Sequence, residues 1–124
     1  MIHVVAALIT DRADRLLLVR KRGTERFMQA GGKPEGGESP RAALVRELSE
    51  ELGLTVGEDV LEPVGAFTTA AANEAGHRLE AEVFSLVVTD PVAPRAEIEE
   101  LRWATREEAA ALGDRLAPLA HLLL

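Results

Sequence analysis

The order of apolar and polar segments along the chain predicts a domain that mixes β-strands with α-helices. Apolar and β-branched residues fill positions 2–10 and 16–20, and the polar turn at 11–15 indicates that they form a β-hairpin. Because these apolar runs are continuous and do not alternate with polar residues, we expect strands that are covered on both faces. Three more strands are predicted, near residues 61–69, 78–89 and 101–104.

A long helix over Pro40–Leu52 is the best-marked element of the sequence. Ser39 is a favourable N-cap, proline suits the first helical position, and Gly53 can end the helix in a left-handed conformation. At about 100° per residue, one stripe of this helix is apolar and must face the core. That stripe contains Leu44, Val45, Leu48 and Leu52.

Two shorter helices are expected near the C-terminal end. Residues 106–112 are predicted to form a surface helix, since Thr105 and Glu108 have the spacing of a capping box, and a shorter helical piece follows from Arg115. The glycine-dense stretch at 31–38 cannot keep regular structure for long. Strands mixed with helices, and the lack of an internal repeat, indicate one domain over residues 1–124 with a layered α/β or α+β architecture.

Composition and charge narrow the classes of function. The 124 residues are 47% hydrophobic and 28% charged, which are ordinary values for a globular domain with one core. The sequence has no cysteine, which excludes a disulfide, a thiolate metal site and a thiol nucleophile. A net charge of −7 and only 3% aromatic residues argue against nucleic-acid binding. No apolar run is long enough for a membrane span or an export signal, so we expect a cytoplasmic protein.

The long helix carries an unfavourable cluster of carboxylates. Glu47, Glu50 and Glu51 have spacings that place them on one face, where they repel one another. Two of them lie in the last turn, where the helix dipole favours cations, and a divalent cation would turn this repulsion into binding. The alternative is a solvated acidic face, in which Arg46 pairs with Glu50. The adjacent glycines and the free N–H groups at the helix start favour a binding site.

Residues 32–54 resemble the signature of the Nudix hydrolases, G-x5-E-x7-R-E-U-x-E-E-x-G-U, in which U is an apolar residue. Every fixed position of this signature is matched. The resemblance implies an α/β/α sandwich with a mixed sheet between helices, and the length is that of the small MutT-like members. It also implies hydrolysis of a nucleoside diphosphate linked to a moiety X. One departure is Ala30, where many MutT-like chains carry proline, so no particular substrate is carried over.

The same resemblance implies roles for individual residues. The implied metal ligands are the side chains of Glu47, Glu50 and Glu51 and the backbone carbonyl of Gly31. They would hold Mg²⁺, with Mn²⁺ as a substitute. Glu38 would tie the loop to the helix through Arg46, which would also orient Glu47.

MutT-like members carry a further glutamate in a loop before a tryptophan-bearing strand. Glu97, six residues before Trp103, is the best match, with Glu99 and Glu100 as rivals in what is otherwise an acidic solvated loop. Either Glu51 or Glu97 could take the proton of the attacking water, and the sequence leaves both open.

Substrate contacts are less clearly marked. Arg20, Lys21 and Arg22, at the end of the second strand, are candidate phosphate contacts, with a plain charged turn as the alternative. Asn73 has the donor and acceptor needed to read a base edge, although a turn residue before Gly76 is the simpler interpretation. The three histidines show no ligand spacing, and the four aromatic residues are expected in the core.

Together these features favour a Mg²⁺-dependent pyrophosphohydrolase that cleaves a small nucleotide, most simply a nucleoside triphosphate. We expect a monomer or homodimer without nucleic acid or membrane as a partner. The alternative is a module that senses a nucleotide without cleaving it, which would not need all three glutamates. A third class, the isoprenoid diphosphate isomerases of the same superfamily, uses a catalytic cysteine that this chain lacks.

Overall fold

The computed structural model describes residues 1–71 and 75–124, and its elements follow a mixed α and β order. The strands are β1 (Ile2–Thr10), β2 (Leu16–Lys21), β3 (Phe27–Met28), β4 (Ala30–Gly32), β5 (Glu62–Ala70), β6 (Arg78–Val87) and β7 (Ile98–Ala104). The helices are α1 (Pro40–Leu52), α2 (Arg106–Ala111) and α3 (Pro118–Leu122), with short 3₁₀ turns η1 (Glu58–Val60) and η2 (Gly113–Arg115).

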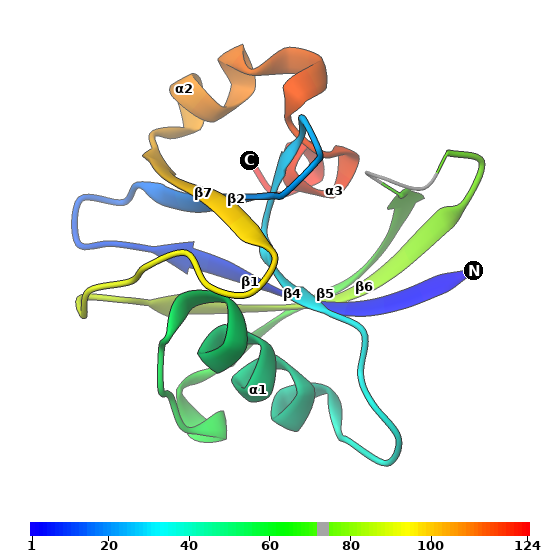
Figure 1. The fold of residues 1–124 in the computed structure, drawn as a ribbon, viewed down its shortest axis with the longest axis vertical. Coiled ribbons are helices and arrows are strands. Elements are labelled where there is room, and N and C mark those ends of the chain that lie inside the picture. Colours follow the sequence, from blue (N-terminus) through cyan, green and yellow to red (C-terminus); the bar gives the residue numbers. More distant parts are fainter. Residues whose placement is uncertain (72–74) are drawn as a thin grey trace.

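Within the described residues, a seven-stranded mixed sheet lies between helices. The main path of the sheet is β3-β2-β1-β6-β5, with β4 paired to β1 and β7 paired to β2. β1 runs parallel to β6 and antiparallel to β2 and β4. Helix α1 covers one face, while α2 and α3 cover the other (Figure 1). The predicted α/β/α architecture is therefore confirmed.

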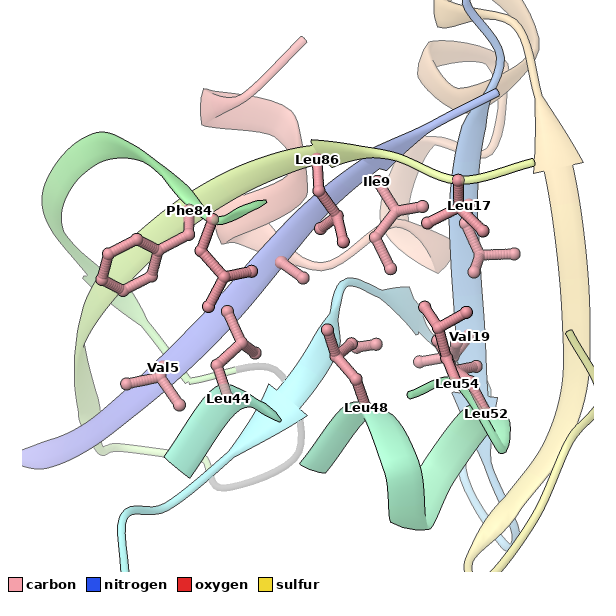
Figure 2. Packing of buried hydrophobic residues seen from close by; sticks show 14 of the residues in the cluster. Val5, Ile9, Leu17, Val19, Leu44, Leu48, Leu52, Leu54, Phe84 and Leu86 are labelled. Carbon is pink, nitrogen blue, oxygen red and sulfur yellow. The ribbon is translucent and has the colours of Figure 1, made fainter. Parts of the chain in front are cut away.

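The continuous apolar runs of β1 and β2 are explained by cores on both faces of the sheet. On one face, Val5, Ile9 and Leu17 pack against Leu44 and Leu48 of α1 (Figure 2). On the other face, Leu16 and Leu18 of β2 and Phe27 of β3 pack with Ala109 of α2 and Ala120 of α3. Because successive side chains of a strand point to opposite faces, each run had to be apolar throughout.

The helix boundaries follow the predicted local signals. The Ser39 hydroxyl accepts a hydrogen bond from the amide of Ala42 at 3.1 Å, and Gly53 ends α1 with φ 66° in the left-handed region. Thr105 and Glu108 form the predicted capping box of α2. The last helical piece, predicted from Arg115, is α3, which begins at Pro118; η2 ends at Arg115.

Two parts of the sheet differ from the sequence prediction. β7 begins at Ile98, three residues before the predicted start, since its backbone pairs with β2 as far as Lys21. Within this ladder the Arg20 Nε lies 3.1 Å from Oε1 of Glu100. The stretch 27–32 contains β3 and β4, which periodicity cannot detect because each is so short. Both differences arise from pairing between residues far apart in the chain.

The loop between β6 and β7 is fastened to the C-terminal end of α1. The amide of Ala93 donates to the carbonyl of Leu52 at 3.2 Å, and the amide of Arg95 donates to the carbonyl of Glu51 at 2.9 Å. These bonds satisfy carbonyl groups that the end of a helix leaves free. They also bring the segment before β7 beside the acidic turn of α1. In the part of the chain that the structure describes, no helix is long and apolar enough to cross a membrane.

Candidate active site

Two glycines allow the acidic helix to lie directly against the sheet. Gly31 pairs with Ala6 and Gly32 pairs with Val5 in the β4–β1 ladder. Gly31 has φ 150°, and a Cβ at this position would collide with the carbonyl oxygen of Val5. A Cβ on Gly32 would lie 2.5 Å from Oε1 of Glu47. The lack of a side chain at Gly32 therefore makes the space that the Glu47 carboxylate occupies.

Glu51 is buried between α1 and β4. Its side chain is 2% exposed, and its Oε1 accepts a hydrogen bond from the amide of Gly31 at 2.9 Å. Its Oε2 has no hydrogen-bond partner among the described residues. Burial raises the pKa of Glu51 to about 7; the charges of Glu47 and Glu97 add to this rise, whereas the Gly31 amide and Lys21 oppose it. A buried carboxylate in this position lacks a positive partner for one of its oxygens.

The other two glutamates of α1 are progressively more exposed. The Glu47 side chain is 14% exposed, and the Glu50 side chain is 54% exposed. Burial, followed by the charges of Glu50 and Glu97, raises the pKa of Glu47, while Arg46 opposes the rise. The exposure of the three carboxylates thus increases from Glu51 through Glu47 to Glu50.

Arg46 connects the glycine-rich loop to the acidic face of α1 through its hydrogen bonds. Its guanidinium donates to both carboxylate oxygens of Glu38, at 2.8 and 2.9 Å. It also donates to Glu47 Oε1 at 3.0 Å and to Glu50 Oε2 at 3.3 Å. The hydrogen bonds from Arg46 lower the pKa of Glu38 to about 2. Arg46 therefore holds Glu47 and Glu50 in place while it anchors the loop.

The loop before β7 brings Glu97, rather than its rivals, to the acidic turn of α1. Glu97 lines a cavity together with Glu47, and its Oε1 lies 3.3 Å from Lys21 Nζ. The carbonyl of Glu97 accepts from the amide of Arg22 at 2.8 Å, which fixes the backbone. Glu99 instead pairs with Arg22, and Glu100 pairs with Arg20.

The three basic residues at the end of β2 are in different environments. Lys21 lines the cavity, where it pairs with Glu97. Arg20 donates to Glu100 and, at 2.9 Å, to the carbonyl of Thr24. Arg22 donates to the carbonyl of Ala96 at 3.3 Å. Of the three candidate phosphate contacts, Lys21 is the one whose side chain lies at the cavity.

The cavity beside these residues has a volume of about 410 Å³ and two chemically different ends. One end is polar and contains Lys21, Gly32, Glu47 and Glu97. The rest is largely apolar, with side chains of β1, β6 and α3. This volume falls within the range of small-ligand sites.

The donor set of the polar end suits a hard divalent cation. Among residues 1–71 and 75–124, no three acidic or histidine side chains are already gathered as a metal site. Arg46 holds Glu47 and Glu50, whereas Glu51 Oε2 is buried and unpaired. A cation bound to Glu51 would supply the missing charge, and carboxylate oxygens are the ligands that Mg²⁺ and Mn²⁺ prefer. The residues present therefore fit such an ion.

One residue that sequence reasoning missed is Gln29. It is 6% exposed, lines the cavity, and has an amide oxygen without a partner among the described residues. Its position two residues before the glycine pair was the available signal, since a polar residue there interrupts an otherwise apolar strand end. The predicted base contact, Asn73, lies outside the described residues. The histidines are apart from the cavity: His3 pairs with Glu80, and His121 hydrogen-bonds the carbonyl of Gly113.

Comparison with known proteins identifies the family. The model of the NUDIX domain matches residues 2–123, so the chain belongs to the Nudix family. In structure, the chain is similar to the MutT protein from Methanosarcina mazei, with a TM-score of 0.78 and 24% identity over 97% of this chain and 86% of that one. This likeness to the MutT protein is one of fold.

Two relatives have names that state different activities. The chain is 34% identical over 116 residues to an isopentenyl-diphosphate Δ-isomerase of Nocardia farcinica, which covers 86% of this chain. It is 52% identical over 68 residues to the CTP pyrophosphohydrolase of Escherichia coli, which covers 48% of this chain. The chain spans 65% of the length of the first relative and 48% of the second.

Proposed function

We propose that this protein is a divalent-cation-dependent pyrophosphohydrolase that cleaves a nucleoside triphosphate into a nucleoside monophosphate and pyrophosphate. Water adds across one phosphoanhydride bond, so its oxygen joins phosphorus and pyrophosphate leaves. Mg²⁺ is the expected cofactor and Mn²⁺ a substitute. CTP is the first substrate to test, because a relative that is 52% identical over 68 residues is a CTP pyrophosphohydrolase.

The observation that carries this proposal is the convergence of four acidic and basic groups on one end of the cavity. Glu47, Glu97 and Lys21 line the cavity, and Lys21 pairs with Glu97. The buried Glu51 accepts from the amide of Gly31 and has one oxygen unpaired among the described residues. Such an acidic cleft binds a pyrophosphate only if cations are present to neutralise the charge.

The residues of the site have separate roles in binding the cation, in positioning and in proton transfer. A divalent cation held by Glu47, Glu50, Glu51 and the Gly31 carbonyl would neutralise the phosphate oxygens and activate the attacking water. Arg46 positions Glu47 and Glu50 through its hydrogen bonds. Lys21 places its ammonium group against the phosphates. Glu97 accepts the proton of the water, because it lines the cavity whereas Glu51 is enclosed beneath β4.

The test is turnover of CTP, ATP, GTP and UTP with Mg²⁺, with Mn²⁺, and with a chelator. We expect pyrophosphate release that requires the cation. Glu51→Gln should reduce kcat at least 100-fold, while Glu107→Gln, on the exposed face of α2, should not change it. Activity that persists in the chelator, or an active Glu51→Gln protein, would contradict the proposal. Tight nucleotide binding without any product would instead identify a sensing module.

A second candidate is isomerisation of an isoprenoid diphosphate, which is favoured by the similarity to the isopentenyl-diphosphate Δ-isomerase. The chain has no cysteine, the residue those isomerases use in catalysis, which counts against it. Incubation with isopentenyl diphosphate distinguishes the two reactions. An isomerase would form the allylic isomer without releasing phosphate, and the proposed hydrolase would not.

A further inference from the structure

A tight turn over residues 95–98 leads into β7 and carries Glu97. The amide of Ile98 donates to the carbonyl of Arg95 at 3.0 Å, which closes the turn. Ala96, its first central residue, has φ 53°, in the left-handed region. Among the described residues other than glycine, only Asp14 also has a positive φ. Turns with a positive φ at this position usually carry glycine or asparagine, so an alanine here is held against its own preference.

The turn keeps this conformation because it is fastened on two sides. On one side, the amide of Arg95 donates to the carbonyl of Glu51 in the last turn of α1, at 2.9 Å. On the other side, the amide of Arg22 donates to the Glu97 carbonyl at 2.8 Å, and its guanidinium donates to the Ala96 carbonyl at 3.3 Å. A strained backbone persists where the surrounding structure determines it in this way. The turn thus joins the acidic end of α1 to the basic end of β2.

A β-bulge lies at the same end of the β2–β7 ladder. The register shifts between Arg20 and Lys21, which leaves Glu99 without an opposite residue in the ladder. Such a bulge changes the direction of the side chains beside it. Lys21 and Glu97 line the same cavity, whereas Glu99 pairs with Arg22. The bulge and the turn therefore act together on the pair that reaches the cavity.

Glu97 needs this support because its side chain is exposed and lies near like charges. The side chain is 59% exposed, and its carboxylate pairs with Lys21. Burial raises the pKa of Glu47 and of Glu51, and the negative charge of Glu97 adds to both rises. An exposed carboxylate that is repelled in this way turns toward the solvent unless its backbone holds it close. The position of Glu97 therefore depends on the turn more than on side-chain packing.

We propose that Ala96 is a positioning residue for Glu97. Its left-handed conformation directs the Glu97 side chain to the cavity, where that carboxylate accepts the proton of the attacking water. Ala96 does not itself line the cavity, so it acts through Glu97. A general base works only within hydrogen-bond reach of the proton it takes, so a small displacement of the turn lowers the rate. This inference rests on the proposed function and adds the residue that positions its base.

The first experiment varies residue 96 and measures turnover of the nucleotide that is cleaved fastest among CTP, ATP, GTP and UTP. Ala96→Val introduces a β-branched side chain, which tolerates a positive φ poorly, so kcat should fall about 10-fold to 100-fold with little change in KM. Ala96→Gly and Ala96→Asn both accept a positive φ and should keep kcat within about 2-fold, although asparagine is larger than alanine. The matched control is Ala93→Val, at an exposed residue of the same loop that lacks a positive φ, and its kcat should equal that of the wild type.

Thermal denaturation tests the strain independently of catalysis. Ala96→Gly removes the Cβ that makes the left-handed conformation unfavourable, so the melting temperature should rise by about 3 °C. Ala96→Val should lower the melting temperature, and Ala93→Val should leave it unchanged. A melting temperature that does not rise in Ala96→Gly would show that the turn is unstrained and would overturn the proposal.

A double-mutant cycle separates positioning of Glu97 from a general structural role. Glu97→Gln alone should lower kcat about 100-fold. In the Glu97→Gln protein, adding Ala96→Val should lower kcat by no more than about 2-fold, because the group that Ala96 positions can no longer accept a proton. A residue with a general structural role would lower kcat by the same factor in both backgrounds.

The outcomes distinguish this proposal from the proposed function. A wild-type protein that cleaves none of the four nucleotides would overturn the pyrophosphohydrolase and, with it, the role of Ala96. Cation-dependent turnover with an unchanged kcat in Ala96→Val, or with equal losses in the two backgrounds of the cycle, would overturn positioning by Ala96 and keep the hydrolase. Equal losses in Ala96→Asn and Ala96→Val would also overturn it, because side-chain size would then decide the rate and not the backbone conformation.

Discussion

Replacing Glu51 by glutamine tests whether this buried carboxylate is kept for a cation at the expense of stability. The pKa of Glu51 is raised from 4.5 to about 7. At about 1.36 kcal/mol for each unit, keeping Glu51 ionised in the metal-free folded protein destabilises it by about 3 kcal/mol. Glutamine keeps an oxygen that can accept from the Gly31 amide and has no charge to desolvate.

The sign of the pH dependence follows from linkage. Between pH 4.5 and about 7 the folded protein holds a proton on Glu51 that the unfolded chain has released, so stability falls as the pH rises. Above about pH 7 the full penalty applies. We therefore expect Glu51→Gln to have nearly the wild-type free energy of unfolding at pH 4.5 and up to about 3 kcal/mol more at pH 8.5.

Urea denaturation in a chelator at these two pH values measures the difference. Repeating it with Mg²⁺ or Mn²⁺ should stabilise the wild type by mass action and leave Glu51→Gln nearly unchanged. The reasoning fails if Glu51→Gln is less stable than the wild type at pH 8.5, or if its advantage does not grow with pH. It also fails for the metal site if cations stabilise both proteins equally.

Three further predictions concern the scaffold of the site. Gly32→Ala places a Cβ 2.5 Å from Oε1 of Glu47, so activity in the turnover assay should fall about 100-fold. The control is Gly36→Ala, whose Cβ meets no atom within 4 Å and whose activity should be near that of the wild type. In Arg46→Lys the lysine side chain cannot keep both hydrogen bonds to Glu38, so kcat should fall about 10-fold to 100-fold with little change in KM. An unchanged kcat would contradict the positioning role of Arg46. Thr105→Ala removes the N-cap of α2, on the other side of the sheet. Thermal denaturation should show a free energy of unfolding lower by about 1 kcal/mol, with unaltered turnover. Thr105→Ser keeps the hydroxyl and should restore the stability.

Local signals in the sequence determined the framework of this protein. The limits of α1 follow from Ser39 and Gly53, and its apolar stripe follows from the helical repeat, because caps and periodicity act within a few residues. The spacing of Glu47, Glu50 and Glu51 placed them on one face for the same reason. The continuous apolar runs of β1 and β2 predicted a sheet covered on both sides, and the resemblance in residues 32–54 gave the family.

Only the tertiary structure decided which groups meet. Glu97 is distinguished from Glu99 and Glu100 because the loop before β7 is hydrogen-bonded to the end of α1, and this contact joins residues more than 40 positions apart. The difference in burial between Glu50 and Glu51 arises from the approach of β4, which no helical repeat encodes. Gln29 is buried in a cavity formed by distant strands and α3. Such contacts depend on the packing of the whole chain, whereas caps, periodicity and spacing are set by neighbours in sequence.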